Sequence, residues 1–262
     1  MSEITFFLNH IEENQQEGAL CIITETHGST PRKVGSKMLV FPNGKIIGSI
    51  GGGRLEKKVI EDAIGVLESG QARQFDHALV FDHEMCCGGR LSIYIEPMIP
   101  KKNLHIFGAG HIGKALAELA VELEFNVTVI DERSDLIKAL DHPLIQKQNM
   151  SHKDAFKMLN FKEKDFVAVI THDHAYDREI IAHCGKFDLA YLGMIGSRRK
   201  VEFSKKIFRE DNALTESQMD SIDWPMGLEI KAQTPKEIAI SIMGKLIEVR
   251  ASIEKGKKKV QQ

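Results

Sequence analysis

The sequence predicts an α/β protein in which a mixed α+β module is followed by a doubly wound parallel sheet. Residues 1–98 combine strand-like segments, one hairpin turn and helices, whereas from Asn103 onward hydrophobic strands alternate with helices. The 262 residues, of which 42% are hydrophobic, suffice for two cores. We therefore expect one domain over residues 1–98, a second over residues 103–254, and a basic tail over residues 255–262.

The first module is expected to open with a short amphipathic helix around residues 4–11, where apolar side chains recur at helical spacing. Strand-like stretches then occupy residues 19–26, 37–41, 45–50, 72–81 and 90–97. The second and third of these flank Pro42-Asn43-Gly44, a tight-turn sequence that predicts an antiparallel hairpin. A helix is predicted over residues 54–69, and residues 98–103, with a proline and two lysines, are typical of a linker.

In the second module, hydrophobic strands are expected over residues 104–110, 127–132, 165–173 and 188–197. Each ends in small or polar residues where a helix should begin, which is the pattern of βαβ units. Ligands of such sheets bind at the carboxyl ends of the strands. A last helix is predicted from Thr234-Pro235 to Arg250, and the basic tail after it is expected to be solvated and frayed.

The composition excludes several classes of partner. With 35 Lys and Arg against 37 Asp and Glu the net charge is −2, so no broad positive field attracts nucleic acid or an anionic membrane. No apolar run approaches the ~18 residues of a membrane span, and the start of the sequence lacks the features of a secretory signal. The four cysteines include the adjacent pair Cys86 and Cys87, which fits no disulfide framework. We therefore expect a cytoplasmic protein with no membrane or nucleic-acid partner.

A glycine-rich turn, Gly108-Ala109-Gly110-His111-Ile112-Gly113, follows a predicted strand and opens a predicted helix, so its N–H groups can face an anion. Asp131 closes the next strand, where a carboxylate would accept hydrogen bonds from a ribose, as in dinucleotide-binding Rossmann folds. Arg133 could instead attract a phosphate or a pterin-type anion, so both cofactor types stay open. A third interpretation is that Gly108, Gly110 and Gly113 only allow tight packing of strand and helix.

Polar residues Thr171-His172-Asp173-His174 end the third strand, so they should lie at the rim of the same crevice. Three interpretations compete. Histidine and aspartate could ligate a metal, His172 or His174 could anchor a substrate or handle a proton, and Asp173 could simply cap the following helix. The sequence does not choose between substrate anchoring and capping.

The fourth strand ends in a cluster of cations that suits a phosphate group. Glycines and a predicted serine N-cap bring the cations to the strand end. The candidate residues are Gly196, Ser197, Arg198, Arg199 and Lys200. The alternative is an ordinary helix start with solvated charges.

Two loops of the first module also have compositions suited to an anion. The loop His27-Gly28-Ser29-Thr30-Pro31-Arg32 joins two strands, and its candidate ligand-binding side chains are His27, Ser29, Thr30 and Arg32. No nucleophile motif accompanies Ser29 or Thr30. Gly51-Gly52-Gly53 precedes a helix, so the N–H groups of Gly51, Gly52 and Gly53 either face a ligand or form a bare turn.

The segment Met85-Cys86-Cys87-Gly88-Gly89-Arg90 carries vicinal thiols on a loop made pliant by glycines. A thiolate is a soft metal ligand and also a nucleophile that can accept a transferred sulfur atom. Cys86 and Cys87 are therefore the candidate sulfur-handling and metal-contacting residues, with zinc binding together with His83 and inert semi-buried thiols as alternatives. Cys21 and Cys184 are predicted to be core residues.

These stretches, taken in order, resemble the XdhC/CoxI family of xanthine dehydrogenase accessory proteins. The segments that carry the resemblance are HGSTPRKVGSKMLV, GSIGGGRLE, MCCGGRLSIYIEP, GAGHIGKALA, VIDER, THDHAYDREI, LGMIGSRRK and PMGLEIKAQTPKEIAISI. They extend over about residues 18 to 250, and their combination is more specific than any one of them. Met226 and Lys231 depart from the family, which more often has isoleucine and glycine at these positions.

The resemblance implies an N-terminal XdhC/CoxI module, a C-terminal Rossmann-like module, and a role in maturing molybdenum hydroxylases. Proteins of this family bind molybdenum cofactor (molybdopterin), assist its sulfuration by a cysteine desulfurase, pass it to a xanthine dehydrogenase-type apoenzyme, and typically form homodimers. By this resemblance Cys86 and Cys87 become candidates for contact with molybdenum or its sulfur, and the His27–Arg32 loop lines the neighbouring pocket. The glycine turn at 108–113 and the cations at 198–200 would suit the phosphate of the cofactor or of its dinucleotide form.

Two enzyme hypotheses compete with a cofactor-binding chaperone. An NAD(P)-dependent oxidoreductase would use the glycine turn and Asp131, with His172 or His174 as proton donor. A sulfurtransferase would carry a persulfide on Cys86 or Cys87. The chaperone is favoured because no self-sufficient catalytic set is present and because an oxidoreductase leaves the paired thiols unexplained.

Overall fold

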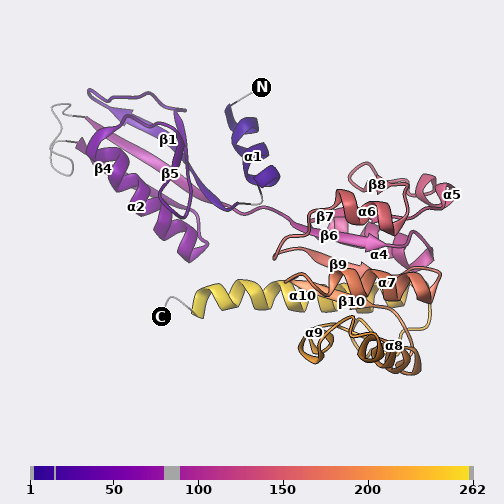
Figure 1. Ribbon diagram of the computed structural model, residues 1–262. Coiled ribbons are helices and arrows are strands. Elements are labelled where there is room, and N and C mark those ends of the chain that lie inside the picture. Colours follow the sequence, from indigo (N-terminus) through magenta and orange to yellow (C-terminus); the bar gives the residue numbers. More distant parts are fainter. Residues whose placement is uncertain (1–2, 15, 80–88, 260–262) are drawn as a thin grey trace. The chain divides into compact units, whose positions relative to one another are not determined.

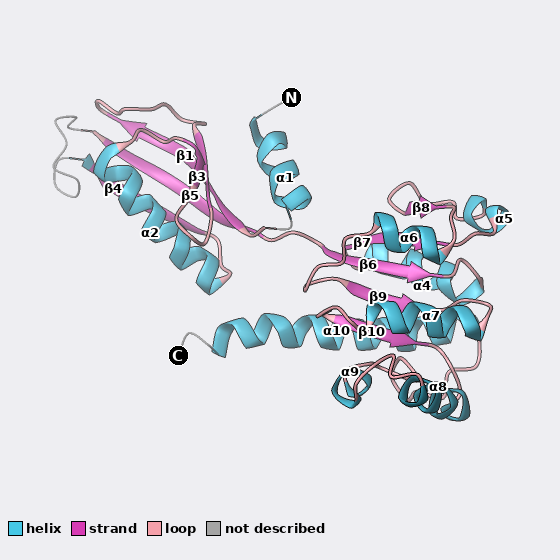
Figure 2. Cartoon of the chain, in the orientation of Figure 1, coloured by secondary structure: helices cyan, strands magenta, loops and turns pink. Residues whose placement is uncertain are grey.

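The computed structural model describes residues 3–14, 16–79 and 89–259. The chain divides into two compact units, residues Met1–Lys101 and Lys102–Gln262, and Figures 1 and 2 show their helices and strands. The first unit has an antiparallel sheet and the second a parallel one, as the sequence predicts for a mixed module followed by a doubly wound sheet.

The N-terminal unit contains a five-stranded antiparallel sheet in the order β3-β2-β1-β5-β4. Its strands are β1 (Gly18–His27), β2 (Lys37–Val40), β3 (Ile46–Gly48), β4 (Arg73–Ala78) and β5 (Arg90–Met98), and its helices are α1 (Glu3–Asn14) and α2 (Gly53–Ser69). The predicted hairpin is confirmed, since β2 pairs antiparallel with β3.

A helix covers each face of this sheet. Successive residues of β1 point to opposite faces, as the two-residue period of a strand requires. Cys21 and Ile23 join the core under α2, whereas Leu20 packs with Phe7 and Ile11 of α1. Both faces are thus buried along β2 and the first part of β1, whereas half of the residues of β4 are exposed.

The C-terminal unit contains a five-stranded parallel sheet in the order β10-β9-β6-β7-β8. Its strands are β6 (Lys102–Phe107), β7 (Phe125–Ile130), β8 (Gln146–Gln148), β9 (Phe166–Val169) and β10 (Tyr191–Met194). The chain runs outward from β6 to one side through β7 and β8, then returns to the other side of β6 at β9. The carboxyl ends of β6 and β9 therefore form the topological switch point where ligands bind in such sheets.

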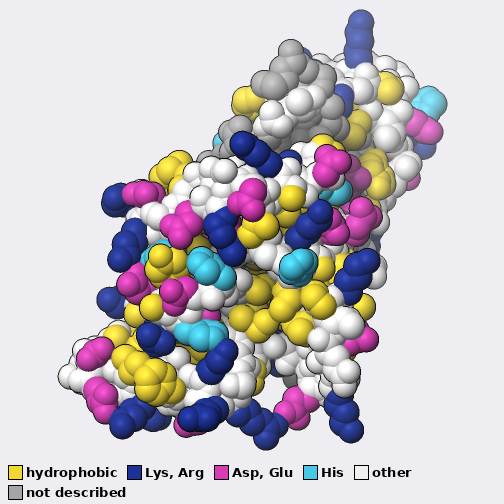
Figure 3. Space-filling view, turned by 90° about the vertical axis from the view of Figure 1, so that its right-hand side faces the viewer, with side chains coloured by type: hydrophobic (Ala, Val, Ile, Leu, Met, Phe, Trp, Pro, Cys, Tyr) yellow, Lys and Arg dark blue, Asp and Glu magenta, His cyan; other side chains and the backbone are white. Residues whose placement is uncertain are grey.

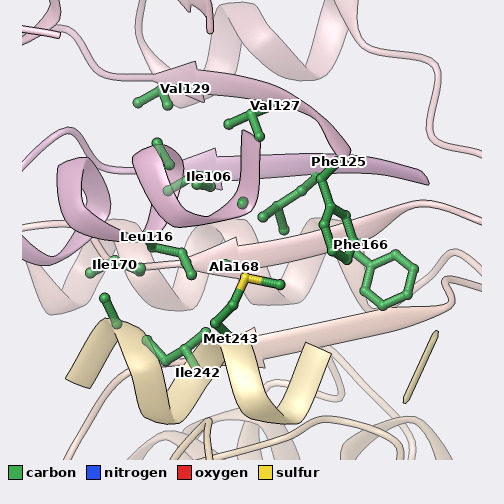
Figure 4. Packing of buried hydrophobic residues seen from close by; sticks show 14 of the residues in the cluster. Ile106, Leu116, Phe125, Val127, Val129, Phe166, Ala168, Ile170, Ile242 and Met243 are labelled. Carbon is green, nitrogen blue, oxygen red and sulfur yellow. The ribbon is translucent and has the colours of Figure 1, made fainter. Parts of the chain in front are cut away.

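Helices cover both faces of the parallel sheet. They are α4 (His111–Glu122), α5 (Ser134–Lys138), α6 (His152–Met158), α7 (His174–Cys184), α8 (Arg198–Glu210), α9 (Glu216–Asp220) and α10 (Pro235–Lys259). On one face, α4 and α10 pack against β6, β7 and β9, where Leu116, Ile242 and Met243 meet Ile106 and Phe166 (Figure 4). On the other face lie side chains of α6, α7, α8 and α9.

Two details differ from the sequence prediction. Strand β6 begins at Lys102, which pairs with Phe125, so the connection to β5 is shorter than the predicted linker over 98–103. Helix α10 continues to Lys259, beyond the predicted end at Arg250, so most of the basic tail is helical rather than frayed. Lysine and glutamate are good helix formers, and lysines near a helix C-terminus interact favourably with its dipole. Among the described helices, none combines the length and apolar character needed to cross a membrane.

Candidate functional site

Two glycine-bearing segments contact the His27–Arg32 loop in the N-terminal unit. Gly51 lies against Pro31, because a Cβ on Gly51 would sit 2.6 Å from the proline Cγ. A Cβ on Gly89 would overlap the carbonyl oxygen of Ser29 and lie 2.8 Å from that of His27. The predicted loop, the glycine triplet and the end of the cysteine segment therefore come together at one end of the sheet.

The glycine triplet is already hydrogen-bonded within the chain. Glu56 Oε2 accepts from the Ser49 hydroxyl at 2.9 Å, from the Gly52 N–H at 3.2 Å and from the Ile50 N–H at 3.4 Å. The Gly51 N–H donates to Ser49 Oγ at 3.2 Å. The chain's own carboxylate thus occupies the position that an external anion would take at the start of α2.

The described cysteines are buried, as predicted from the sequence. Cys21 and Cys184 are both fully inaccessible, and burial raises the pKa of each thiol to about 12, with Asp62 contributing at Cys21. Neither is available as a thiolate near neutral pH. The candidates Cys86 and Cys87, together with His83, lie outside the described residues.

The glycine turn after β6 has two packing glycines and one open glycine. Gly108 has a φ of 119°, and a Cβ there would overlap the carbonyl oxygen of Ile170 at the end of the neighbouring strand. A Cβ on Gly113 would overlap the Gly108 carbonyl, so Gly113 lets α4 approach the turn closely. No atom lies within 4 Å of a Cβ on Gly110, and no side chain caps α4 at this residue. The helix start is therefore open at Gly110.

Next to this turn, Asp131 and Arg133 form a two-point ion pair. Arg133 Nε donates to Asp131 Oδ1 at 2.9 Å, and a terminal guanidinium nitrogen donates to Oδ2 at 2.6 Å. The Ala109 N–H also donates to Oδ2, at 2.8 Å. Burial would raise the pKa of the Asp131 carboxyl, but the hydrogen bonds from Arg133 and Ala109 outweigh it and hold this pKa below its usual value. The carboxylate is thus engaged within the chain, while the guanidinium is about one-third exposed.

A small pocket, which we call the switch-point pocket, opens at the carboxyl ends of β6, β7 and β9. Its lining is Phe107, Gly108, Ile130, Asp131, Glu132, Met150, His152, Thr171, His172, Tyr176 and Ile180. The Tyr176 ring lies between two histidines, with its centroid 4.8 Å from that of His152 and 5.8 Å from that of His172. With a volume of about 30 Å³ the pocket takes no more than a water-sized group, and its aromatic side chains lie near Asp131 of the ion pair.

A second cavity of about 540 Å³, which we call the α7–α8 pocket, lies between α7 and α8 at the carboxyl end of β10. Its lining is His174, Asp177, Arg178, Met194, Ile195, Ser197, Arg199, Lys200, Phe203 and Ser204. Ser197 caps α8 by accepting from the Lys200 N–H, and Asp173 caps α7 by accepting from the Ala175 N–H. Figure 3 views the side toward which the strand arrows of this unit point, where histidine, basic and hydrophobic side chains lie close together.

The cation cluster predicted at residues 198–200 is divided by the structure. Arg199 and Lys200 line the α7–α8 pocket, whereas Arg198 pairs with Glu229, and both of these side chains are exposed. His172 lies in the switch-point pocket and His174 in the α7–α8 pocket, so the two histidines of the motif serve different cavities. Within the described parts of the chain, no three His, Cys, Asp or Glu side chains are grouped as metal ligands.

The sequence analysis did not single out Asp177, which organises the α7–α8 pocket. Its Oδ1 accepts from the Thr171 hydroxyl at 2.7 Å and from the Thr171 N–H at 3.1 Å, and its Oδ2 lies 3.1 Å from His174 Nδ1. Burial raises the pKa of the Asp177 carboxyl despite these hydrogen bonds. The sequence could have indicated this contact, because Asp177 comes three residues after His174 and therefore lies on the same face of a helix.

Comparison with protein families identifies the chain's relatives. A family model described as the XdhC Rossmann domain matches residues 104–246, which is more than half of the 262 residues. The chain belongs to the XdhC family. A second model, described as the XdhC and CoxI family, matches residues 11–79 of this XdhC-family chain. The resemblance noted in the sequence is confirmed, and so is the Rossmann-like fold of the C-terminal unit.

This XdhC-family chain is 32% identical over 249 residues to the uncharacterized protein YqeB of Escherichia coli (strain K12), a match that covers 92% of this chain and 45% of YqeB. It is 28% identical over 169 residues to a probable xanthine dehydrogenase subunit of Bacillus subtilis (strain 168), covering 62% and 47% of the two chains. The chain thus spans about half the length of these curated relatives.

Among solved structures, the crystal structure of a xanthine dehydrogenase (BH1974) from Bacillus halodurans matches with a TM-score of 0.53 and 22% identity. The match covers 96% of both chains. At this identity the similarity shows only that the two proteins share a fold.

Proposed function

We propose that this chain is a maturation factor that binds molybdenum cofactor, supports its sulfuration, and delivers it to a xanthine dehydrogenase-type hydroxylase. Membership of the XdhC family supports this role. The similarity to the Bacillus subtilis protein named as a probable xanthine dehydrogenase subunit also supports it. A cysteine desulfurase as sulfur donor, a homodimeric assembly and a cytoplasmic location are parts of the same proposal.

The observation that carries the proposal is the engagement of Asp131 by Arg133. In a dinucleotide-binding fold this carboxylate would accept hydrogen bonds from a ribose. Here both of its oxygens already accept hydrogen bonds from Arg133, and one also accepts from the Ala109 N–H. The group left to meet a ligand is a guanidinium beside the open helix start at Gly110, and this combination favours a phosphate.

The donor set of the C-terminal unit suits the phosphate of a phosphorylated pterin. Arg133 and the N–H groups at the start of α4 would hold the phosphate, and the pterin ring would lie outside the switch-point pocket, whose volume of about 30 Å³ takes no more than a water-sized group. When bound, the cofactor would supply the molybdenum centre that the client enzyme uses. The chain's own residues would bind and orient the cofactor and would limit its exposure to water.

The thiols of Cys86 and Cys87 are proposed to handle the sulfur or contact the molybdenum. Gly89, two residues after Cys87 in the sequence, packs against the backbone of the His27–Arg32 loop. This loop carries the imidazole of His27 and the guanidinium of Arg32, groups that favour a nearby thiolate. Glu56 already satisfies much of the Gly51–Gly53 turn, so this turn is proposed to support the loop rather than to bind the anion.

Gel filtration of the protein mixed with molybdenum cofactor tests the proposal. We expect co-elution that is weakened by Cys86→Ala or Cys87→Ala and by Arg133→Gln. Arg198→Gln is the control, because Arg198 pairs with Glu229 outside both pockets and should leave retention unchanged. Equal retention in wild type and in both cysteine variants would overturn the thiol role, and failure of the wild type to retain cofactor would overturn the proposal.

An NAD(P)-dependent oxidoreductase is the competing function, and the Rossmann-like sheet is what favours it. Asp131 is hydrogen-bonded to Arg133 and is therefore less available to the ribose of NAD. Arg133 would suit the 2′-phosphate of NADP, so NADP is the better candidate of the two. Fluorescence titration with NADH and NADPH separates the two functions. Tight binding together with hydride transfer to a carbonyl compound would favour the oxidoreductase over the maturation factor.

A further inference from the structure

The α7–α8 pocket is a cavity distinct from the glycine turn, and its positive charges exceed its negative ones. Arg178 from α7 and Arg199 and Lys200 from α8 line it, with Asp177 as its carboxylate. Asp177 is almost fully buried and is hydrogen-bonded to Thr171 and His174, and it forms no ion pair with Arg178 or Arg199. No carboxylate of the described residues forms an ion pair with Arg199. An anionic ligand would supply the missing charge.

A chain of contacts holds Lys200 at this cavity. The Lys200 ammonium contacts His174 Nε2. Because an ammonium group can only donate, Nε2 accepts in this contact, and Nδ1 carries the proton that is donated to Asp177 Oδ2 at 3.1 Å. Thr171 fixes the other oxygen of Asp177. The Asp177–His174 pair therefore orients Lys200, whose ammonium group has no second hydrogen-bond partner among the residues that the structure describes.

The other side of the cavity is apolar. Met194 and Ile195 at the end of β10 line it together with Phe203 of α8. Phe203 is 57% exposed as a residue, and the Arg178 guanidinium lies 5.8 Å from its ring centroid. A cavity of about 540 Å³ is in the range of small-molecule sites. It has room for more than an inorganic anion, and an exposed aromatic ring favours a flat organic group.

We propose that the α7–α8 pocket is a binding site for an organic phosphate, with the phosphate held by Arg199 and Lys200 and a flat organic group packed on Phe203. His174 and Asp177 are positioning residues that act through Lys200. The site does not depend on the proposed role in molybdenum cofactor maturation, since its residues are separate from the glycine turn and from Arg133.

Isothermal titration calorimetry of the full chain with adenosine monophosphate, inorganic phosphate and adenosine tests this site. We expect adenosine monophosphate to bind at least tenfold more tightly than inorganic phosphate, and adenosine not to bind measurably. Arg199→Gln should weaken adenosine monophosphate at least tenfold. Its sequence neighbour provides the matched control: Arg198→Gln should leave the affinity unchanged, because Arg198 pairs with Glu229 away from the cavity.

Further variants distinguish a built site from a general attraction of anions to basic side chains. Phe203→Ala should reduce the advantage of adenosine monophosphate over inorganic phosphate. His174→Gln, which keeps an acceptor for Lys200, should retain more affinity than His174→Phe when both variants are measured well below their thermal midpoints. The proposal would be overturned by equal loss in Arg198→Gln and Arg199→Gln, by adenosine binding as well as its monophosphate, or by no binding at millimolar ligand. Loss in Arg133→Gln but not in Arg199→Gln would also overturn it by moving the site to the glycine turn.

Discussion

Arg133 holds Asp131 at two points at the carboxyl end of β7, with Nε 2.9 Å from Oδ1 and a terminal nitrogen 2.6 Å from Oδ2. The Arg133 backbone N–H also donates to Oδ1, at 3.0 Å. The same carboxylate accepts from Ala109 in the glycine turn, so the pair links two neighbouring strand ends. This arrangement leaves the partly exposed guanidinium, rather than the carboxylate, to meet a ligand, and our functional proposal depends on it.

Stability in acid should depend on this pair. Burial opposes ionisation of Asp131, but the hydrogen bonds from Arg133 and Ala109 prevail and hold the pKa of the carboxyl below its usual value of about 3.9. A group with a lowered pKa in the folded state stabilises the fold above its unfolded pKa and loses this effect as the pH falls through the folded pKa. Urea unfolding should therefore show a smaller loss of stability below about pH 4 in Asp131→Asn than in wild type. An identical acid-induced loss in both proteins would contradict this.

Removing the arginine should cost stability at neutral pH. Arg133→Gln leaves a buried carboxylate with fewer hydrogen bonds, and we expect a loss of about 1–2 kcal/mol in the free energy of unfolding. Chemical denaturation at pH 7 measures it. The double variant Asp131→Asn with Arg133→Gln should recover part of the loss, since the unpaired charge is gone. A double variant less stable than Arg133→Gln would argue against this account.

Two glycines of one turn should respond differently to the same substitution. Gly113→Ala places a Cβ in overlap with the Gly108 carbonyl and should cost about 1–3 kcal/mol or more. Gly110→Ala meets no atom within 4 Å and should leave the unfolding midpoint nearly unchanged. Thermal unfolding of both variants provides the comparison. Equal destabilisation would show that packing does not distinguish the two positions.

The carboxylate of Glu56 should stabilise the glycine triplet of the N-terminal unit. Glu56→Ala removes the acceptor for Ser49 and two backbone N–H groups, and should cost about 1–3 kcal/mol. Glu61→Ala on the same helix removes only an exposed contact with Lys58 and should have little effect. Hydrogen exchange at Gly52 should quicken in the first variant alone. Unchanged exchange there would show that Glu56 does not secure the turn.

Alkylation should distinguish the cysteines. Burial raises the pKa of the Cys21 and Cys184 thiols to about 12, so iodoacetamide at pH 8 should leave both unmodified in the native protein. Peptide mass spectrometry should find the adducts on Cys86 and Cys87, and on all four residues only after denaturation. Rapid native modification of Cys21 or Cys184 would contradict their burial.

Most of the fold could be predicted because the buried strands are strong local signals. Phe166–Val169, for example, is a fully buried run that continues through Ile170 and lies between the polar residues Asp165 and Thr171. In contrast, β8 consists of Gln146, Lys147 and Gln148, and only its pairing with β7 makes it a strand. No hydrophobic pattern marks such an edge strand.

The sequence could predict which kinds of residues lie at the candidate site, but not which of them contact one another. The sequence placed polar residues at the strand ends, yet Glu56 and Asp177 were missed because their role arises from contacts across a turn or a helix. The division of Arg198 from Arg199 follows from Glu229, which is remote in sequence. Lys231 has a φ of 58°, the left-handed conformation that the glycine more often found there in the family favours.

The most direct test of the maturation role is the molybdenum and pterin content of the full chain purified from a host that makes molybdenum cofactor. Metal analysis and fluorescence of the oxidised pterin measure the two components. We expect both in a fixed ratio to protein, with a reduced amount in Cys86→Ala with Cys87→Ala and in Arg133→Gln. Protein that carries neither molybdenum nor pterin, from cells in which the cofactor is abundant, would contradict the account.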